Sequence, residues 1–427
     1  MTRVGLINLG CPRNLVDAEV MLGLLKKEGY TITEDFADCD AAVVNTCSFI
    51  EDAKKESIDL ILQLVELKKL KKIRSIIVTG CLPQRYAAEL RAELSEVDSF
   101  IGTNDFVHIP EIVRRTLAGE KVTRVTTRKK FLYDHTYRRD FITPGHFAYL
   151  KLSEGCNNRC SYCVIPSVRG NLRSRSISSV LEEARLLKAS GKLSELNLIG
   201  QDLTNYGVDR YKEPRLAQLL VKLAALAPAR WIRLLYTHPA HYTDDLIAVV
   251  RDEPAVCKYL DIPLQHINNR ILKAMNRGIN KAAIIKLITR LRKEIPALTI
   301  RTTFLVGFPG ETDEEFNELL QFISEMKFER LGIFSYSREE GTPAHGLKGQ
   351  VPEKVKKERF DLLMRRQQEI ARAVNARELG REVEVLIDEP SENKQLPGQP
   401  REFIGRTAAD APEVDGTCFV TSRKDHV

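Results

Sequence analysis

Residues 153–163 read SEGCNNRCSYC and place three cysteines, Cys156, Cys160 and Cys163, within eight residues. Thiolates this close repel one another unless a cation lies between them, and closely spaced thiolates are the ligands of iron–sulfur clusters. No fourth cysteine or histidine lies nearby in the sequence, whereas a closed structural zinc site needs four ligands. Three thiolates on a four-iron cluster leave one iron open to an outside ligand, which predicts a reactive site rather than a simple electron carrier.

These thiols have two alternative uses. A disulfide with one spare thiol requires an oxidising compartment, and a zinc site requires a fourth ligand from a distant part of the chain. We favour the cluster because the cysteines are so tightly spaced. A strand-like run and a turn at Gly155 precede them, which fits a ligand loop at the end of a strand.

The spacing of this loop, with the aromatic Tyr162 just before the last cysteine, resembles the cluster loop of the radical S-adenosylmethionine (SAM) enzymes. The resemblance implies a 4Fe–4S cluster whose open iron chelates the amino and carboxylate groups of SAM. It also implies that one electron from the cluster cleaves SAM to a 5′-deoxyadenosyl radical, which takes a hydrogen atom from an unactivated carbon.

The composition is that of a soluble globular protein, with 427 residues, 43% hydrophobic and 29% charged. The length predicts about three domains. No apolar run is long enough to span a bilayer, and the first residues enter a strand pattern without the layout of a signal peptide. We therefore expect a cytoplasmic protein with reduced thiols and no membrane partner. The net charge of +7 is compatible with a nucleic-acid or ribosomal partner but is no proof of one.

Residues 1–137 alternate strand-like and helical runs, which predicts an α/β domain with a parallel sheet. Cys11, Cys47 and Cys81 each follow a strand-like run and precede a helical one. The carboxyl ends of parallel strands form the ligand-binding edge of such a sheet, and helix N-termini there favour thiolates. Any one of these cysteines alone would pass for a small buried residue. Three in the same position predict a metal or cluster site.

This half of the chain resembles the N-terminal domain of the methylthiotransferases, a branch of the radical SAM enzymes. In that family three such cysteines bind a second 4Fe–4S cluster, again with one open iron. Residues 9–19, LGCPRNLVDAE, resemble the branch that modifies a ribosomal protein. The tRNA-modifying branch usually has Gln-Met-Asn where this chain has Pro12-Arg13-Asn14. We leave Cys39, Cys257 and Cys418 as structural residues.

The segment from Ala118 to Pro144 is polar and basic, and we expect a solvated linker there rather than a contact with an anionic partner. Its basic residues include Arg124, Arg128, Lys129, Lys130, Arg138 and Arg139.

Residues 140–346 contain six strand-like runs separated by helical ones, which predicts a parallel α/β barrel or partial barrel. The runs are 147–152, 195–199, 231–236, 259–264, 299–306 and 330–336. The cysteine loop follows the first run, as expected because active sites of such folds lie at the carboxyl ends of the strands. The resemblance implies the partial (β/α)6 barrel of radical SAM enzymes.

Further candidate SAM-binding residues follow other strand-like runs. The resemblance places Gln201 and Asp202 near the methionine amino group, and Gly307 where the backbone approaches adenine. Gln265 directly follows the fourth run, in a stretch that resembles the same family. Arg169, Arg173 and Arg175 are candidates to pair with the SAM carboxylate, with Arg173 the one we select. The alternatives are a plain turn around Gly307 and solvated surface for each arginine. We assign no catalytic residue beyond the cluster ligands.

The sequence pattern of residues 347–379 predicts a linker helix, and that of residues 380–427 predicts a small β module. Residues 405–416, GRTAADAPEVDG, resemble the TRAM module, a small β-barrel that binds the macromolecular substrate. Further strands normally follow this point in that module, so either the barrel is incomplete or the sequence is shortened. Residues 380–427 carry ten acidic and six basic residues, a net charge of −4. An acidic module suits a basic ribosomal protein better than RNA.

Together these features predict a methylthiotransferase with two 4Fe–4S clusters, SAM and an external electron donor. The resemblance implies that it adds a methylthio group to the β-carbon of an aspartate in the twelfth small-subunit ribosomal protein. Radical chemistry suits this reaction because that C–H bond is too weakly acidic for a general base. The alternatives are a tRNA methylthiotransferase acting on a modified adenosine, with RNA as partner, and a non-catalytic two-cluster electron carrier.

Overall fold

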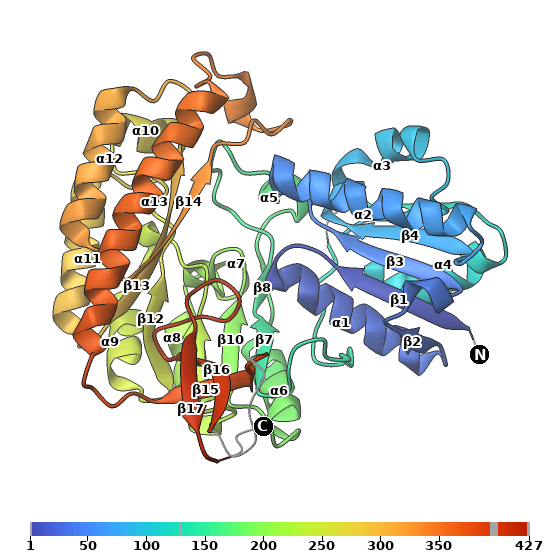
Figure 1. The fold of residues 1–427 in the computed structure, drawn as a ribbon, viewed down its shortest axis with the longest axis horizontal. Helices are drawn as coiled ribbons and strands as arrows, with labels where there is room; N and C mark the ends of the chain where they lie inside the picture. Colours follow the sequence, from blue (N-terminus) through green and yellow to red (C-terminus); the bar gives the residue numbers. More distant parts are fainter. Residues whose placement is uncertain (1, 128–129, 393–399, 425–427) are drawn as a thin grey trace.

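The computed structural model describes residues 2–127, 130–392 and 400–424, and these form an N-terminal domain, a central barrel and a C-terminal module (Figure 1). No helix in these ranges is long and apolar enough to cross a membrane.

The N-terminal domain is built on a six-stranded parallel sheet with the strand order β2-β1-β3-β4-β5-β6. The strands are β1 (Arg3–Asn8), β2 (Thr31–Thr33), β3 (Ala41–Thr46), β4 (Ser75–Gly80), β5 (Ser99–Ile101) and β6 (Val122–Arg124). The helices are α1 (Pro12–Lys27), α2 (Glu51–Lys69), α3 (Cys81–Glu93) and α4 (Ile109–Leu117), with short 3-10 turns η1 (Phe36–Asp38) and η2 (Phe106–His108).

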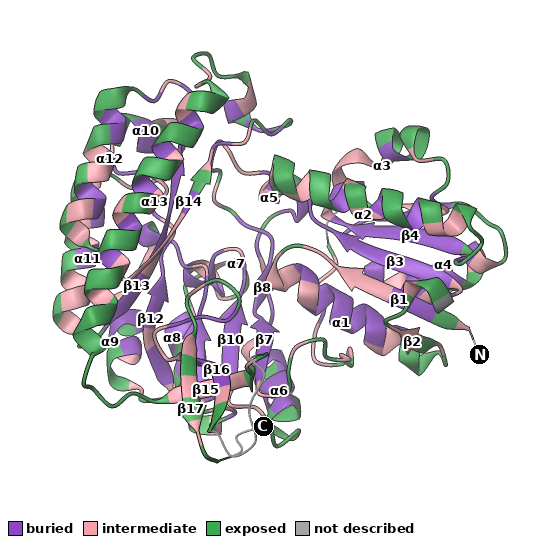
Figure 2. Cartoon of the chain, in the orientation of Figure 1, coloured by how far each residue is buried: buried purple, intermediate pink, exposed green. Residues whose placement is uncertain are grey.

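Both faces of this sheet are covered, so β3 and β4 are buried along their whole length (Figure 2). Val43 packs with residues of α1 and α4 on one face, whereas its neighbour Val44 packs with residues of α2 and α3 on the other. The predicted parallel α/β domain is therefore confirmed. The sequence did not reveal β2, β5 and β6, because a three-residue strand is too short to show a periodic pattern.

The central sheet is also parallel, and its six strands follow one another in chain order from β7 to β14. They are β7 (Phe147–Lys151), β10 (Glu195–Ile199), β11 (Trp231–Leu234), β12 (Val256–Asp261), β13 (Thr299–Val306) and β14 (Arg330–Ser335). The longer helices, which line the outside in Figure 1, are α6 (Ile177–Lys188), α8 (Leu216–Leu226), α9 (Asp244–Asp252), α10 (Asn269–Ala274), α11 (Lys281–Glu294) and α12 (Asp313–Met326). Short elements are β8 (Ser153–Glu154), β9 (Arg173–Ser174), α5 (Ile165–Val168), α7 (Val208–Tyr211), η3 (Leu203–Asn205), η4 (Pro239–His241) and η5 (Pro343–Gly346).

This arrangement confirms the predicted six-stranded partial barrel. The fourth strand lies three residues earlier than the expected 259–264. Pro263 explains the difference, because proline has no N–H to donate to a sheet ladder.

The C-terminal part begins with α13 (Glu353–Asn375) and η6 (Ala376–Glu378), and α13 packs against β14 and α12. The module that follows is an antiparallel sheet of β15 (Val385–Pro390), β16 (Arg401–Thr407) and β17 (Cys418–Ser422). It lies at the amino-terminal end of the barrel, where Arg406 pairs with Glu195, the first residue of β10. Asp415 pairs with Arg301 inside the barrel. The module thus closes the end of the barrel opposite the strand ends that carry the cysteine loop.

The basic segment before the barrel is not simply a solvated linker. Arg124 belongs to β6, and the Arg139 side chain is only 3% exposed. Arg139 pairs with Glu19 of α1 at 2.5 Å and with Glu183 of α6 at 2.7 Å. The expectation was wrong for these residues, because a local charge pattern does not reveal carboxylates that approach from distant segments. Arg128 and Lys129 lie outside the described residues.

Candidate active site

The cysteine loop leaves the barrel at β8 and folds back on itself. Gly155 has φ +79°, and a Cβ there would lie 2.2 Å from the Asn171 carbonyl oxygen, so only glycine fits. The Cys156 N–H donates to the Gly170 oxygen at 3.0 Å. Cys156 and Cys160 are buried. Burial raises the pKa of Cys156 to about 11, and burial together with the neighbouring Cys160 thiol raises that of Cys163 to about 12.

Arg277 lies beside this loop and was not predicted from the sequence. Its Nη1 donates to Cys160 Sγ at 3.2 Å, and its Nη2 donates to the Pro263 carbonyl oxygen. A buried guanidinium stabilises a thiolate beside it. Nothing in the sequence singles out Arg277, because it comes 117 residues after Cys160.

The other three predicted cysteines meet at the carboxyl ends of β1, β3 and β4, which are neighbours in the sheet. Cys11 precedes α1, Cys47 follows β3, and Cys81 begins α3. A Cβ added at Gly10, which has φ +90°, would lie 2.7 Å from the Cβ of Cys47. Burial, followed by the charges of the Cys81 and Cys11 thiolates, raises the pKa of Cys47 to about 12.

These thiols fit the chemistry of an iron–sulfur cluster. Three thiolates held this close together repel one another, and a cationic cluster relieves that repulsion. Burial opposes ionisation of Cys11, but the guanidinium groups of Arg13 and Arg169 outweigh it and lower the pKa of that thiol. Among the described residues, no group of three or more His, Cys, Asp or Glu side chains is arranged to hold a single metal ion.

The close contact between Gly10 and Cys47 gives a testable result. We expect Gly10→Ala to move Cys47 and to reduce iron binding by the N-terminal domain, because alanine both clashes there and disfavours positive φ. Iron per chain after reconstitution measures the effect. Gly29→Ala is the control, since Gly29 also has positive φ but no atom lies near its Cβ position. Equal iron contents in the two variants would contradict this reading.

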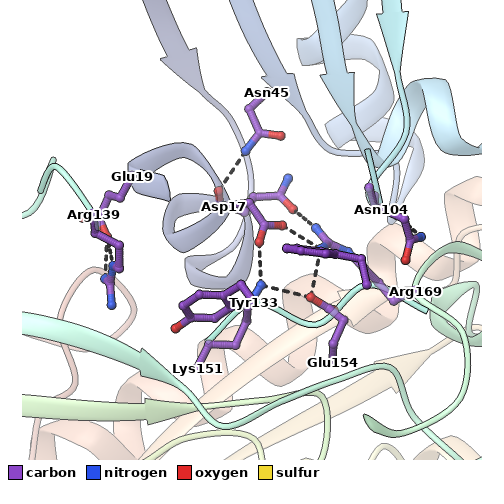
Figure 3. A network of polar contacts seen from close by, with 12 residues as sticks. Asp17, Glu19, Asn45, Asn104, Tyr133, Arg139, Lys151, Glu154 and Arg169 are labelled. Atoms are coloured by element: carbon purple, nitrogen blue, oxygen red, sulfur yellow. Dashed lines mark hydrogen bonds and ion pairs between the residues drawn. The ribbon is translucent and has the colours of Figure 1, made fainter. Parts of the chain in front are cut away.

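A buried polar network lies between α1 of the N-terminal domain and the start of the cysteine loop (Figure 3). Lys151 of β7 donates to Asp17 of α1 at 2.5 Å and to Glu154 at 2.9 Å. Arg169 donates to the same two carboxylates at 2.6 and 3.2 Å. Its other nitrogen, Nη2, reaches Cys81 Sγ at 3.6 Å. The network therefore extends from an N-terminal-domain cysteine to Glu154, two residues before Cys156.

A second contact between the domains is the ion pair of Arg85 of α3 with Glu339 at 2.8 Å. The N-terminal domain is thus held to the barrel by this pair as well as by the network around Arg169.

The structure places the predicted SAM-binding residues in two groups. Gln201 and Asp202 lie against the cysteine loop: Gln201 donates to Glu154 at 2.8 Å, and Asn158 of the loop donates to Asp202 at 2.8 Å. Gln265, with φ +73°, continues the sheet beside β13. Gly307 packs against α13, where an added Cβ would lie 2.3 Å from Lys356 Cγ.

The three arginines after the loop all have protein partners. Arg173 donates to the carbonyl oxygens of Arg169, Asn171 and Phe131. Arg175 pairs with Glu183 at 2.5 Å, and Arg169 belongs to the network above. Each is at least partly buried, so solvated surface does not describe them.

Asp202 gives the site a dependence on pH. Burial alone would raise the pKa of its carboxyl, but a hydrogen bond with His241 and the nearby His238 and Thr204 hold that pKa at about 2. A depressed folded-state pKa contributes stability above the ordinary value of 3.8 that is lost as the pH falls toward 2. The full contribution is about 2 kcal/mol.

We therefore expect the wild-type protein to lose about 1 kcal/mol more stability than Asp202→Asn between about pH 5 and about pH 3. Urea unfolding at the two pH values measures this difference. Parallel losses in the two proteins would show that Asp202 is not held ionised by its neighbours.

Comparisons with known proteins agree with this geometry. Residues 150–323 match the radical SAM superfamily, residues 3–102 match the Uncharacterized protein family UPF0004, and residues 379–427 match the TRAM domain. The fold resembles that of the radical SAM methyltransferase TsrM from Kitasatospora setae, with a TM-score of 0.60 and 16% identity over 81% of this chain and 74% of that one.

Curated relatives match almost the whole chain. The protein of Geotalea uraniireducens is 50% identical over 98% of this chain and 92% of its own length. That of Geobacter sulfurreducens is 48% identical over 100% of this chain and 94% of its own length. Both are named ribosomal protein uS12 methylthiotransferase RimO. With all three parts matched and identity this high along its length, the chain belongs to the RimO family of radical SAM methylthiotransferases.

Proposed function

We propose that the chain transfers a methylthio group to the β-carbon of an aspartate in ribosomal protein uS12. The names of its relatives support this substrate. The observation that carries the proposal is the presence of two three-cysteine groups, one on each domain, with a buried network between the domains in which Arg169 contacts both Cys81 and Glu154. A fully ligated electron carrier would need four cysteines for each cluster.

In this proposal Cys156, Cys160 and Cys163 hold the SAM-binding 4Fe–4S cluster, and Cys11, Cys47 and Cys81 hold a second one. When bound, these groups supply one-electron cleavage of SAM and a place for the sulfur that is transferred. Arg277 balances the charge of Cys160, and Asn158 ties the loop to Asp202 at the end of β10. Gln201, Asp202, Arg173, Gln265 and Gly307 remain the proposed surroundings of SAM.

The substrate protein and an external one-electron donor are the proposed partners. The acidic C-terminal module, with its net charge of −4, suits a basic ribosomal protein. A tRNA substrate is the second candidate, and the sequence Pro12-Arg13-Asn14 and the names of the relatives weigh against it.

Anaerobic reconstitution with iron and sulfide tests the cofactor part of the proposal. We expect about eight iron atoms per chain, and formation of 5′-deoxyadenosine when SAM and a strong reductant are added. A content of about four iron atoms would show that the second cluster is absent, and this result would overturn the proposed methylthiotransferase function. Eight iron atoms without the nucleoside would instead identify an electron carrier.

A further inference from the structure

Arg13 reaches from the N-terminal domain into the barrel. It is the second residue of α1 and lies two residues after Cys11. Its Nη1 donates to the Gly200 carbonyl oxygen at 2.8 Å, just before Gln201 at the end of β10. Its guanidinium carbon lies 4.4 Å from the centre of the Tyr236 ring, which follows β11. Arg13 therefore lies between a cysteine of one group and the strand ends that adjoin the other.

Arg13 differs from the other arginines of the site in what its guanidinium contacts. Arg169 and Arg277 are buried, and their guanidinium N–H groups donate hydrogen bonds to carboxylates, to carbonyl oxygens and to cysteine sulfur. Arg13 is only half-buried, and Gly200 is its one hydrogen-bond acceptor among the described residues. A guanidinium has five N–H donors, so most of those of Arg13 are available to a ligand.

The surroundings of Arg13 favour an anion. The ring of Tyr236 covers one face of the guanidinium, which leaves its edge for the two parallel hydrogen bonds that a carboxylate makes. The sixteen-residue helix α1 adds the positive end of its dipole. Glu154, the carboxylate of the network whose charge acts on Arg13, is already paired with Lys151 and Arg169.

We propose that Arg13 binds the side-chain carboxylate of the substrate aspartate. This inference rests on the proposed function. The reacting β-carbon is bonded directly to that carboxylate, so a guanidinium that holds the carboxylate also places the β-carbon between the two cysteine groups. A site that pairs with a polar group of its substrate rejects analogues that lack the group, because its own donors are then left unpaired.

Binding of a short peptide to the reconstituted protein without SAM tests the proposal. The peptide carries the uS12 target segment with either the natural aspartate or asparagine, and fluorescence anisotropy gives Kd. We expect the wild type to bind the aspartate peptide roughly 30-fold more tightly than the asparagine peptide. Arg13→Met is expected to bind both peptides equally weakly, and Arg13→Lys, which keeps the charge, to retain part of the preference.

A control variant and the iron content keep the result interpretable. Arg185→Met removes an exposed arginine of α6 and is expected to keep the full preference for aspartate. The iron count of Arg13→Met shows whether the clusters still assemble. If the clusters do not assemble in this variant, the affinities of the wild type for the two peptides still test the proposal. Equal affinities would overturn the role of Arg13.

Three further outcomes separate this inference from the proposed function. Equal affinities together with a methylthio product on the aspartate peptide would overturn only the role of Arg13. A clear preference for aspartate that persists undiminished in Arg13→Met would assign the carboxylate to another residue. Absence of product on either peptide with the fully reconstituted wild type would overturn the proposed function itself.

Discussion

Cys160→Ala is expected to abolish SAM cleavage and to lower the iron content from about eight to about four atoms per chain. Cys160 is buried in the loop after β8 with Arg277 as its partner, and two thiolates do not hold the SAM-binding cluster. Cys47→Ala is expected to remove a similar amount of iron while 5′-deoxyadenosine is still formed, because Cys47 lies in the other group. Iron analysis and chromatography of the nucleoside give both quantities.

Cys418→Ala is the matched control for these two variants. Cys418 is a free cysteine of the C-terminal module, far from both groups along the chain, and we expect its replacement to leave about eight iron atoms and full SAM cleavage. If Cys47→Ala behaved like Cys418→Ala, the cysteines at the edge of the N-terminal sheet would not bind a cluster.

Arg169→Met is expected to cost about 3–5 kcal/mol of stability, because it leaves buried carboxylates without their partner. Asp17 and Glu154 lie within 2.6 and 3.2 Å of the Arg169 guanidinium, and all three side chains are less than 10% exposed. Lys151 alone would then face two negative charges. Since Asp17 belongs to α1 and Glu154 to the barrel, the loss should also loosen the contact between the two domains.

Denaturant unfolding and hydrogen exchange of α1 measure these two effects. The matched control is Arg185→Met, which removes an exposed ion pair with Glu182 and should cost at most about 0.5 kcal/mol. An Arg169→Met protein as stable as Arg185→Met would show that the network does not hold the domains together.

The positions of the six cysteines could be predicted because they follow from general rules of topology. A cysteine that ends a parallel strand lies at the ligand-binding edge whatever its distance along the chain. Cys11, Cys47 and Cys81 accordingly come together, although up to 70 positions separate them along the chain. The order and direction of the long buried strands followed from their hydrophobic runs in the same way.

The charged partners of the site could not be predicted. Lys151 lies within a strand that reads as purely structural, and its partner Asp17 is 134 residues away. The sequence marks Arg13 only as part of a family motif, and its contact with Gly200 spans 187 residues. Such pairs depend on how two domains pack against each other, which no local pattern records. For the same reason the local charge pattern predicts a linker residue at Arg139, although this side chain pairs with Glu19 and Glu183.

The choice of substrate is tested most directly by mass spectrometry of a single anaerobic reaction. The reconstituted protein receives SAM, a strong reductant, purified uS12 and tRNA together, so that both candidate substrates compete for the same enzyme. We predict the mass increase of one methylthio group on an aspartate of uS12, with the tRNA nucleosides unchanged. A methylthiolated adenosine in the tRNA, with uS12 unmodified, would contradict the assignment.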